Sequence, residues 1–144
     1  MPEKRPDLAA MIAPLGRALA MAELPILERH GLTMWGYVVL LGLGDEPVYT
    51  QAALAKKIRA DKTRIIGTLD ELQQRGLIRR DLDPADRRAR LISLTPTGRT
   101  TRGQAQHDIQ EQENRLLAQL PAADRKSFLR SLQTLWASVV DPSS

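Results

Sequence analysis

The apolar residues near the start of the chain recur at alternating four- and three-residue steps, which is the spacing of one stripe along an α-helix. A polar arm of residues 1–6 precedes the stripe, and Asp7 is the expected N-cap. Pro14 is expected to bend this helix, because proline removes a backbone hydrogen bond, and Pro25 is expected to end it. The stripe consists of Leu8, Ile12, Leu15, Leu19 and Ala22.

The end of the chain carries a second strong stripe, which begins after Pro121. It is made by Phe128, Leu132, Leu135, Trp136 and Val139. The segment before it, from Gly98 to about Gln119, is helical in composition but polar on almost every face, as in a helix that bridges two bodies. One small domain offers little surface to cover both terminal stripes. We therefore expect them to bury each other across a two-fold axis in a homodimer.

Between these ends, Gly31 precedes a short segment that is apolar nearly all round. Thr33 can cap this helix, which should be buried because it has no polar face. Its expected stop signals are Gly42, Gly44, Asp45 and Pro47. A very short strand at Val48 and Tyr49 is expected to follow.

Two short helices are predicted next. Thr50 caps the first, residues 51–58, and Asp61 caps the second after a turn at 59–61. Gly76 is placed to end the second helix. The inner face of the first holds Leu54 and Ile58, and that of the second holds Ile65, Ile66, Leu69 and Leu72.

A strand at 77–82, turn residues at 83–86 and a returning strand at 91–95 complete this region, and Pro96 starts the next helix. That order is a helix-turn-helix followed by a β-hairpin wing. The expected fold is mainly α with a small β-hairpin (α+β). We expect residues 31–98 to form the winged region, with the helix-turn-helix at 51–75 and the wing at 77–95. Residues 1–30 and 99–144 would then supply the dimerisation helices.

The charge distribution favours a polyanionic partner. The chain of 144 residues has a formal net charge of +4, which alone says little, since many soluble proteins are equally basic. However, eight of its 21 basic residues lie within residues 75–102. They are Arg75, Arg79, Arg80, Arg87, Arg88, Arg90, Arg99 and Arg102.

Several classes of protein are excluded or disfavoured by composition. There are no cysteines, which excludes disulfides, cysteine zinc ligands and thiol redox sensing, and fits a cytoplasmic location. The charged N-terminus lacks a long apolar core, and the longest apolar run, near 37–43, is too short for a membrane span. His30 and His107 lie in unrelated contexts and no catalytic motif is present. We therefore expect no enzyme activity, cofactor, metal site or membrane partner.

A helix-turn-helix reads DNA by placing its second helix in the major groove. Arg64 is the strongest base-reading candidate, because arginine can pair bidentately with guanine. A glycine in mid-helix, such as Gly67, lowers helix stability by roughly 1 kcal/mol relative to alanine. Either the helix simply tolerates this loss, or the missing side chain lets the helix approach the groove closely. The expected outward face is Thr63, Arg64, Gly67, Thr68 and Glu71, with Lys62 and Gln74 at its margins and Lys56 and Lys57 near the phosphates.

The hairpin is the second candidate contact. Arg87, Arg88 and Arg90 lie at or near its tip, where an arginine can enter the narrow, electronegative minor groove. DNA would repel Asp86 unless it is paired, so we assign it a structural role in holding an arginine of the wing or of the reading helix. An ordinary solvated loop would have the same composition. Its position directly after a helix-turn-helix favours the DNA interpretation.

The sequence resembles the MarR family of winged-helix transcriptional regulators along its whole length. The resemblance is carried by Gly31-Leu32-Thr33, Leu54-Ala55, Asp61-Lys62, Leu69-Asp70-x-Leu72, Gly76-Leu77, Asp83-x-x-Asp86-x-Arg88 and Leu94-Thr95-x-x-Gly98. It implies an obligate homodimer, usually a repressor, on a pseudo-palindromic double-stranded operator. It also implies that Arg88 enters the minor groove with Asp86 as its structural partner. Many members carry a basic or polar residue where Gly67 stands, so here Arg64 is expected to read in its place.

Many members of that family release DNA when a small aromatic or anionic ligand binds between the dimerisation helices and the winged helix. Ordinary core and dimer packing is the competing interpretation for each candidate in such a cleft. The candidates are Met11, Leu15, His30, Met34, Trp35, Tyr37 and Val38.

Two other functions compete with a regulator. A winged helix that binds protein would need an exposed apolar patch on the reading helix, which the predicted face lacks. An architectural DNA binder without operator specificity would need more basic residues there and no effector cleft.

Overall fold

The computed structural model describes residues 4–44 and 49–141. These residues belong to two compact units, Met1–Asp108 and Ile109–Ser144, each of which is described here by itself. The first unit contains α1 (Leu8–Arg29), α2 (Met34–Gly42), β1 (Tyr49–Thr50), α3 (Gln51–Lys57), α4 (Lys62–Gln74), β2 (Ile78–Asp83) and β3 (Asp86–Leu94). Helix α5 (Pro96–Leu117) begins in the first unit and ends in the second, which also holds α6 (Ala122–Val140).

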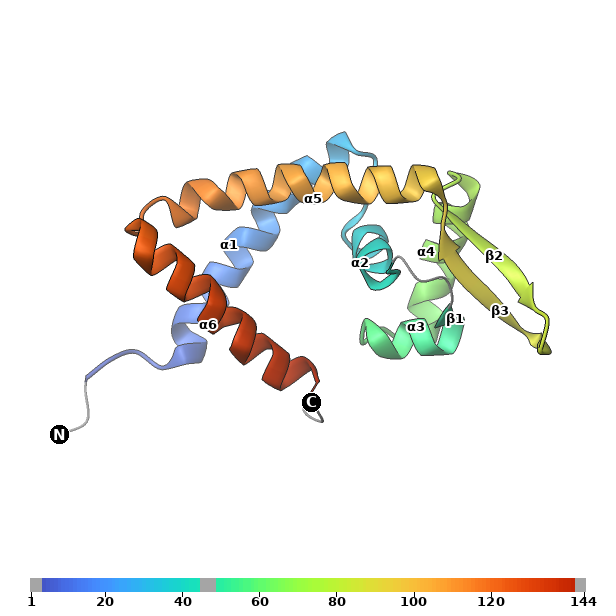
Figure 1. The fold of residues 1–144 in the computed structure, drawn as a ribbon, viewed down its shortest axis with the longest axis horizontal. Helices are drawn as coiled ribbons and strands as arrows, with labels where there is room; N and C mark the ends of the chain where they lie inside the picture. Colours follow the sequence, from blue (N-terminus) through green and yellow to red (C-terminus); the bar gives the residue numbers. More distant parts are fainter. Residues whose placement is uncertain (1–3, 45–48, 142–144) are drawn as a thin grey trace. The chain divides into compact units, whose positions relative to one another are not determined.

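The first unit is a winged helix-turn-helix, as predicted (Figure 1). Its three strands form one antiparallel sheet in the order β1-β3-β2, with Ile78 opposite Leu94 and Tyr49 opposite Ile92. Strand β3 begins at Asp86, five residues before the predicted start, because residues 86–90 also pair with β2. Val48, Asp45 and Pro47, to which the sequence assigned a strand and stop signals, lie outside the described residues.

The capping residues of the winged region act as expected. The Thr33 hydroxyl accepts the Gly36 N–H at 3.0 Å, and the Thr50 hydroxyl accepts the Ala53 N–H at 3.1 Å. Asp61 caps α4 through the Thr63 N–H at 3.1 Å. Gly76 ends that helix with a φ of +71°, a conformation that glycine adopts without strain. These local features fix the starts of α2, α3 and α4 and the end of α4.

The core of the first unit is aliphatic. Ile65, Leu69 and Leu72 of α4 are at most 2% exposed. Ile66 is 43% exposed, so the prediction that it shares this face was wrong. Ile66 follows Ile65 by one residue, which turns its side chain about 100° around the helix. Other core residues are Leu27, Val39, Leu40, Leu43, Leu54, Ile78 and Ile92.

A short network at the base of the wing joins α4, β2, β3 and α5. The Thr95 N–H donates to the Leu77 carbonyl at 3.1 Å, and the Thr95 hydroxyl donates to the Gly76 carbonyl at 2.6 Å. The same hydroxyl accepts the Gly98 N–H at 2.9 Å, which caps α5. A Cβ on Gly98 would lie 1.9 Å from the Leu77 carbonyl oxygen. Only glycine therefore fits at this junction.

Helix α1 departs from the prediction in two ways. It continues through both Pro14 and Pro25 to Arg29, with Ile26 and Leu27 buried in its last turns. Asp7 has the backbone conformation of an N-cap but makes no side-chain capping bond. The helix is also long and apolar enough to cross a membrane by length and composition alone, with a mean hydropathy of 1.4 over 18 residues that are 11% buried. The longest mainly apolar segment of the described residues is thus α1, and not the run at 37–43.

Candidate nucleic-acid interface

The burial of α4 determines which of its residues face outward. Because Ile65, Leu69 and Leu72 are buried, helical geometry places residues 63, 67, 70 and 74 on the opposite side. Thr63 and Gly67 lie there as expected. The predicted face is rotated in part, since Arg64, Thr68 and Glu71 lie on one flank of α4 and Thr68 is half-buried. Asp70, to which the sequence assigned no role, lies closer to the centre of the outward face.

Arg64 is held by a residue of another helix. Its guanidinium lies over the ring of Trp35 in α2, 5.5 Å from the ring centroid, within the range of a cation–π interaction. Arg64 is exposed and Trp35 is half-buried. The neighbouring Asp61 accepts both the N–H and the hydroxyl of Thr63. These two hydrogen bonds, the backbone one first, lower the pKa of Asp61, so this cap is charged at neutral pH.

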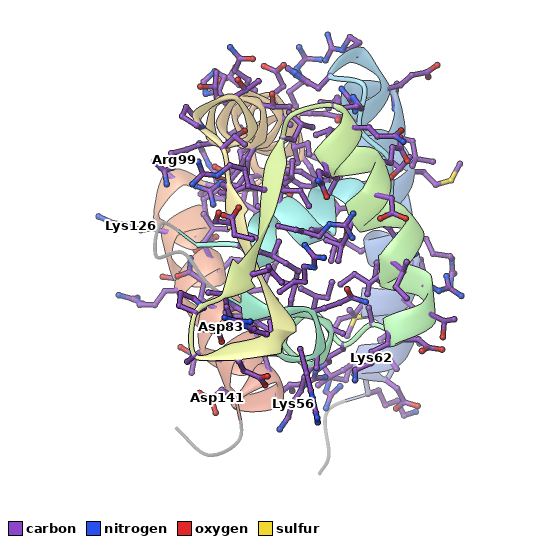
Figure 2. All side chains as sticks on the ribbon, turned by 90° about the vertical axis from the view of Figure 1, so that its right-hand side faces the viewer. Lys56, Lys62, Asp83, Arg99, Lys126 and Asp141 are labelled. Atoms are coloured by element: carbon purple, nitrogen blue, oxygen red, sulfur yellow. The ribbon has the colours of Figure 1, made fainter. Side chains whose placement is uncertain are left out.

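The predicted phosphate-binding lysines differ in their surroundings. Lys57 donates from Nζ to the Gly42 carbonyl at 2.9 Å, so its charge lies at the C-terminal end of α2, where a cation is favourable. Lys56 and Lys62 are exposed. In the view of Figure 2, Lys56, Lys62 and Asp83, the last residue of β2, all lie in the lower half of the picture.

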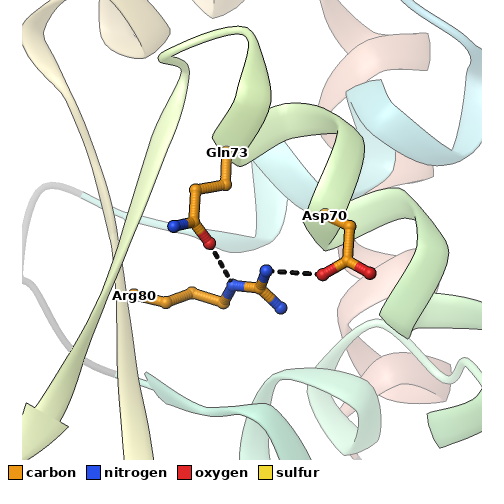
Figure 3. A network of polar contacts seen from close by, with 3 residues as sticks. All are labelled: Asp70, Gln73 and Arg80. Carbon is orange, nitrogen blue, oxygen red and sulfur yellow. Dashed lines mark hydrogen bonds and ion pairs between the residues drawn. The ribbon is translucent and has the colours of Figure 1, made fainter.

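Arg80 connects the wing to α4, which sequence reasoning did not predict. From β2 its Nε donates to Gln73 Oε1 at 2.6 Å, and its Nη2 lies 2.5 Å from Asp70 Oδ1 (Figure 3). The Arg80 side chain is only 20% exposed. The one available signal was the spacing of Asp70 and Gln73, which places both on the same side of a helix. A polar cleft of about 380 Å³ adjoins this network and is lined by Gln51, Gln73, Arg80 and Arg90.

The wing turn is organised by two aspartates. Asp83 Oδ1 accepts the Ala85 N–H at 2.9 Å, and Asp86 Oδ1 accepts the Arg88 N–H at 3.0 Å. Asp86 therefore holds Arg88 through its backbone, whereas the sequence suggested a bond to an arginine side chain. Within the described residues, the guanidinium groups of Arg87, Arg88 and Arg90 form no ion pair, and all three residues are exposed.

Comparison with known proteins identifies this arrangement. The model of the MarR family matches residues 32–89. CouR from Rhodococcus jostii RHA1, in its structure bound to p-coumaroyl-CoA, is 27% identical, with a TM-score of 0.80 over 96% of this chain and 94% of that chain. Residues 32–89 are a MarR-family region, and the chain as a whole is similar to regulators of this kind. The predicted family and winged-helix fold are thus confirmed.

Two further comparisons concern regulation and DNA. Transcriptional regulator HosA from Escherichia coli O111:H- is 37% identical over 71 residues, which cover 49% of this chain and 53% of HosA. The repressor CouR, in a structure bound to a 23-mer DNA duplex, is 28% identical, with a TM-score of 0.77 over 90% of this chain and 92% of that chain. The predicted function, a DNA-binding transcriptional regulator, agrees with these relatives.

The ligand-binding candidates of this chain differ in their surroundings. Tyr37 is 5% exposed and belongs to the core, whereas Met11 and Leu15 on α1 are 42% and 40% exposed. Met34, Trp35 and Val38 of α2 are half-buried. His30 borders a pocket of about 530 Å³, whose other lining residues are Arg99, Thr100, Gly103, Gln104, His107 and Asp108.

His30 also forms a specific contact between α1 and α5. Its Nε2 lies 2.7 Å from Asp108 Oδ2. The hydrogen bond from His30 lowers the pKa of Asp108, which keeps the carboxylate charged at neutral pH. This contact holds the residue after α1 against the middle of α5.

Proposed function

We propose that this protein acts in the cytoplasm as a homodimeric repressor, which binds a pseudo-palindromic DNA operator and is released from it by a small aromatic or anionic ligand. The observation that carries the proposal is the wing of a MarR-family winged helix. Its turn presents exposed arginines that form no ion pair with residues 4–44 or 49–141, beside a capped helix of the size that enters a major groove.

The DNA-binding residues have different proposed roles. Arg88, whose backbone is held by Asp86, enters the minor groove, where a narrow width strengthens the negative potential. Arg64 reads a base in the major groove. The sequence-independent phosphate contacts are assigned to Lys56, Lys57, Lys62, Thr63, Thr68, Arg87 and Arg90, with Gly67 allowing close approach.

The terminal helices are proposed to form the dimer. Each carries apolar side chains that this chain leaves exposed, such as Ile12 at 54% on α1 and Trp136 at 63% on α6. Burial against a second copy accounts for this surface. A membrane span by α1 is disfavoured, because Arg17 lies near its middle and a charge at the bilayer centre costs about 3 kcal/mol. Residues 1–30 and 99–144 would thus form the dimer region and residues 31–98 the reading region.

The ligand is proposed to be an aromatic acid or its thioester. CouR is described as bound to p-coumaroyl-CoA, which joins an aromatic acyl group to an anionic carrier. In this chain the pocket beside His30 contains Arg99 and His107, which suit an anionic group. Loss of DNA binding on addition of p-coumaric acid or its thioester would support this part of the proposal, and unchanged binding would exclude these two compounds.

The DNA-binding proposal is tested by selecting bound duplexes from a randomised library and titrating the enriched sequence by electrophoretic mobility shift. Arg88→Ala should weaken binding to matched and mutated duplexes alike, with a salt slope shallower by about one unit. Arg64→Ala should cost about 1–3 kcal/mol and relax the preference at one base pair per half-site. Lys126→Ala removes the same charge from α6 and is the control. Unchanged affinity in both arginine variants would contradict the assignment.

A further inference from the structure

The contact between Arg64 and Trp35 links α4 to α2. Trp35 is the second residue of α2, whose buried residues Val39 and Leu40 belong to the same core as Ile65 of α4. The backbone of Trp35 therefore belongs to a packed helix, and its side chain is half-buried. The Arg64 guanidinium lies 5.5 Å from the centroid of that ring.

The geometry of the stack leaves Arg64 able to read a base. A cation–π contact uses the flat face of the guanidinium, whereas hydrogen bonds to guanine use the N–H groups at its edge. Within the described residues, no ion pair or side-chain hydrogen bond occupies that edge. Asp61, the nearest acidic residue before Arg64 on the chain, is already occupied by Thr63.

The stack also addresses a difficulty of reading DNA with arginine. A long exposed side chain has many rotamers, and ordering it on binding reduces affinity. Arg64 lies on a flank of α4, where an unrestrained side chain could adopt several orientations. The ring beneath it restricts those orientations before DNA arrives.

We propose that Trp35 is a positioning residue for DNA reading, which presents the guanidinium of Arg64 to a base through the stack and itself does not touch DNA. This inference rests on the proposed function. It assigns part of the operator specificity to α2, outside the helix-turn-helix formed by α3 and α4. A cation–π contact at an exposed site corresponds to a loss of about two- to fivefold in affinity when the ring is removed.

The first test compares base preference among variants on the duplex that the unmodified protein enriches from a random library. Trp35→Leu should relax preference at the same base pair as Arg64→Ala, with a two- to fivefold loss of affinity there. The double variant should lose no more than Arg64→Ala alone, because both act through one contact. Trp35→Phe, which keeps an aromatic face, should retain most of the preference. Leu41→Ala on the same helix, where Leu41 is 43% exposed, is the matched control.

The outcomes separate the inference from the function on which it rests. If the unmodified protein enriches no sequence, the proposed function and this inference both fail. If it enriches a sequence and Trp35→Leu keeps the full base preference, only the inference fails. Additive losses in the double variant would likewise overturn it, because Trp35 and Arg64 would then act independently.

A spectroscopic test needs no DNA and covers the case in which Trp35→Leu does not fold. The chain has two tryptophans, so Trp136→Phe leaves Trp35 as the only one. In that background, Arg64→Met should change the intensity and wavelength of Trp35 emission, because the charge over the ring is removed. A spectrum identical to that of the Trp136→Phe parent would show that the stack is absent in solution and would overturn the proposal.

Discussion

Gly98 shows why one residue of the wing motif must be glycine. The first turn of α5 passes directly over Leu77, the residue before β2. The backbone atoms that a side chain would meet are held by the Thr95 bonds to Leu77 and Gly76, so they cannot easily move away. The spacing from Leu94 to Gly98 is thus a packing requirement, which connects a sequence motif to a close contact between two backbones.

Gly98→Ala is expected to lower the free energy of unfolding by roughly 1–3 kcal/mol through overpacking. Gly103→Ala on the same helix is the control, since its Cβ would meet nothing within 4 Å. That substitution should raise stability by about 0.5–1 kcal/mol. Chemical denaturation at one protein concentration measures both. Equal stabilities for the two variants would contradict the contact between Gly98 and Leu77.

At the scale of elements, the orientation of the wing relative to α4 depends on a polar connection. Arg80 of β2 bonds Asp70 and Gln73, one turn apart on α4. Two elements that are proposed to touch different grooves of the duplex are thereby held by one side chain. In the proposed complex, this connection would set how the wing arginines and α4 contact DNA at the same time.

Arg80→Ala should lower stability by about 0.5–1.5 kcal/mol, a modest value because Asp70 is 55% exposed. It should also weaken DNA binding, since the wing is less restrained. Arg79→Ala is the control, because its ion pair with Asp81 is 4.0 Å long and well exposed. Urea unfolding together with mobility-shift titration separates the two variants. Equal effects of both substitutions would argue against the connection.

The contact between His30 and Asp108 should make the stability of the fold depend on pH in the acidic range. Because the hydrogen bond from His30 holds the pKa of Asp108 below its ordinary value of 3.8, the contact stabilises the fold above that value. The stabilisation is lost as the pH falls below 3.8 through the folded pKa. Melting temperatures measured from pH 5 to pH 2.5 should therefore fall less steeply for Asp108→Asn than for the unmodified protein. Asp7→Asn, at a cap without a side-chain bond, should keep the original slope.

The sequence predicted most of these elements because their signals are local. Thr33, Thr50 and Asp61 cap helices through bonds to residues two or three positions ahead. Signals that depend on distant contacts were missed. Pro25 does not end α1, since Ile26 and Leu27 are buried as helix, and β3 is longer than its composition suggested, because pairing with β2 extends it.

The candidate site shows the same division. The exposed wing arginines follow from turn chemistry and charge, which are visible along the chain. The stack of Arg64 on Trp35 joins residues 29 positions apart, and the Arg80 connection joins a strand to a helix. The spacing of Asp70 and Gln73 places both on one side of a helix, but no sequence period names Arg80 or Trp35 as the distant partner.

At the scale of the whole molecule, the apolar surface that remains exposed is concentrated on the terminal helices. Helix α6 has no buried residue. Its apolar side chains Leu135, Trp136 and Val139 are 60%, 63% and 65% exposed. Solvent contact over such a face is unfavourable at about 25 cal/mol per Å². The proposed dimer would remove it and would double the number of DNA contacts by symmetry.

Sedimentation should therefore give about twice the chain mass of 16.0 kDa at micromolar concentration. Leu135→Glu should shift the protein toward a monomer and strongly reduce operator affinity, because a buried charge at the interface is costly. Thr134→Glu places the same carboxylate on the other side of α6 and should leave the mass unchanged. A monomer for the unmodified protein would remove the dimer proposal.

The junction at Thr95 has a mechanical consequence. The last turn of α4, the start of β2, the end of β3 and the first turn of α5 meet within a few bonded residues, with no flexible linker among them. A twist applied to the first turns of α5 would therefore act on the end of α4 and on the base of the wing together. In the proposed DNA complex, we expect a displacement there to move both Arg64 and Arg88 relative to the duplex.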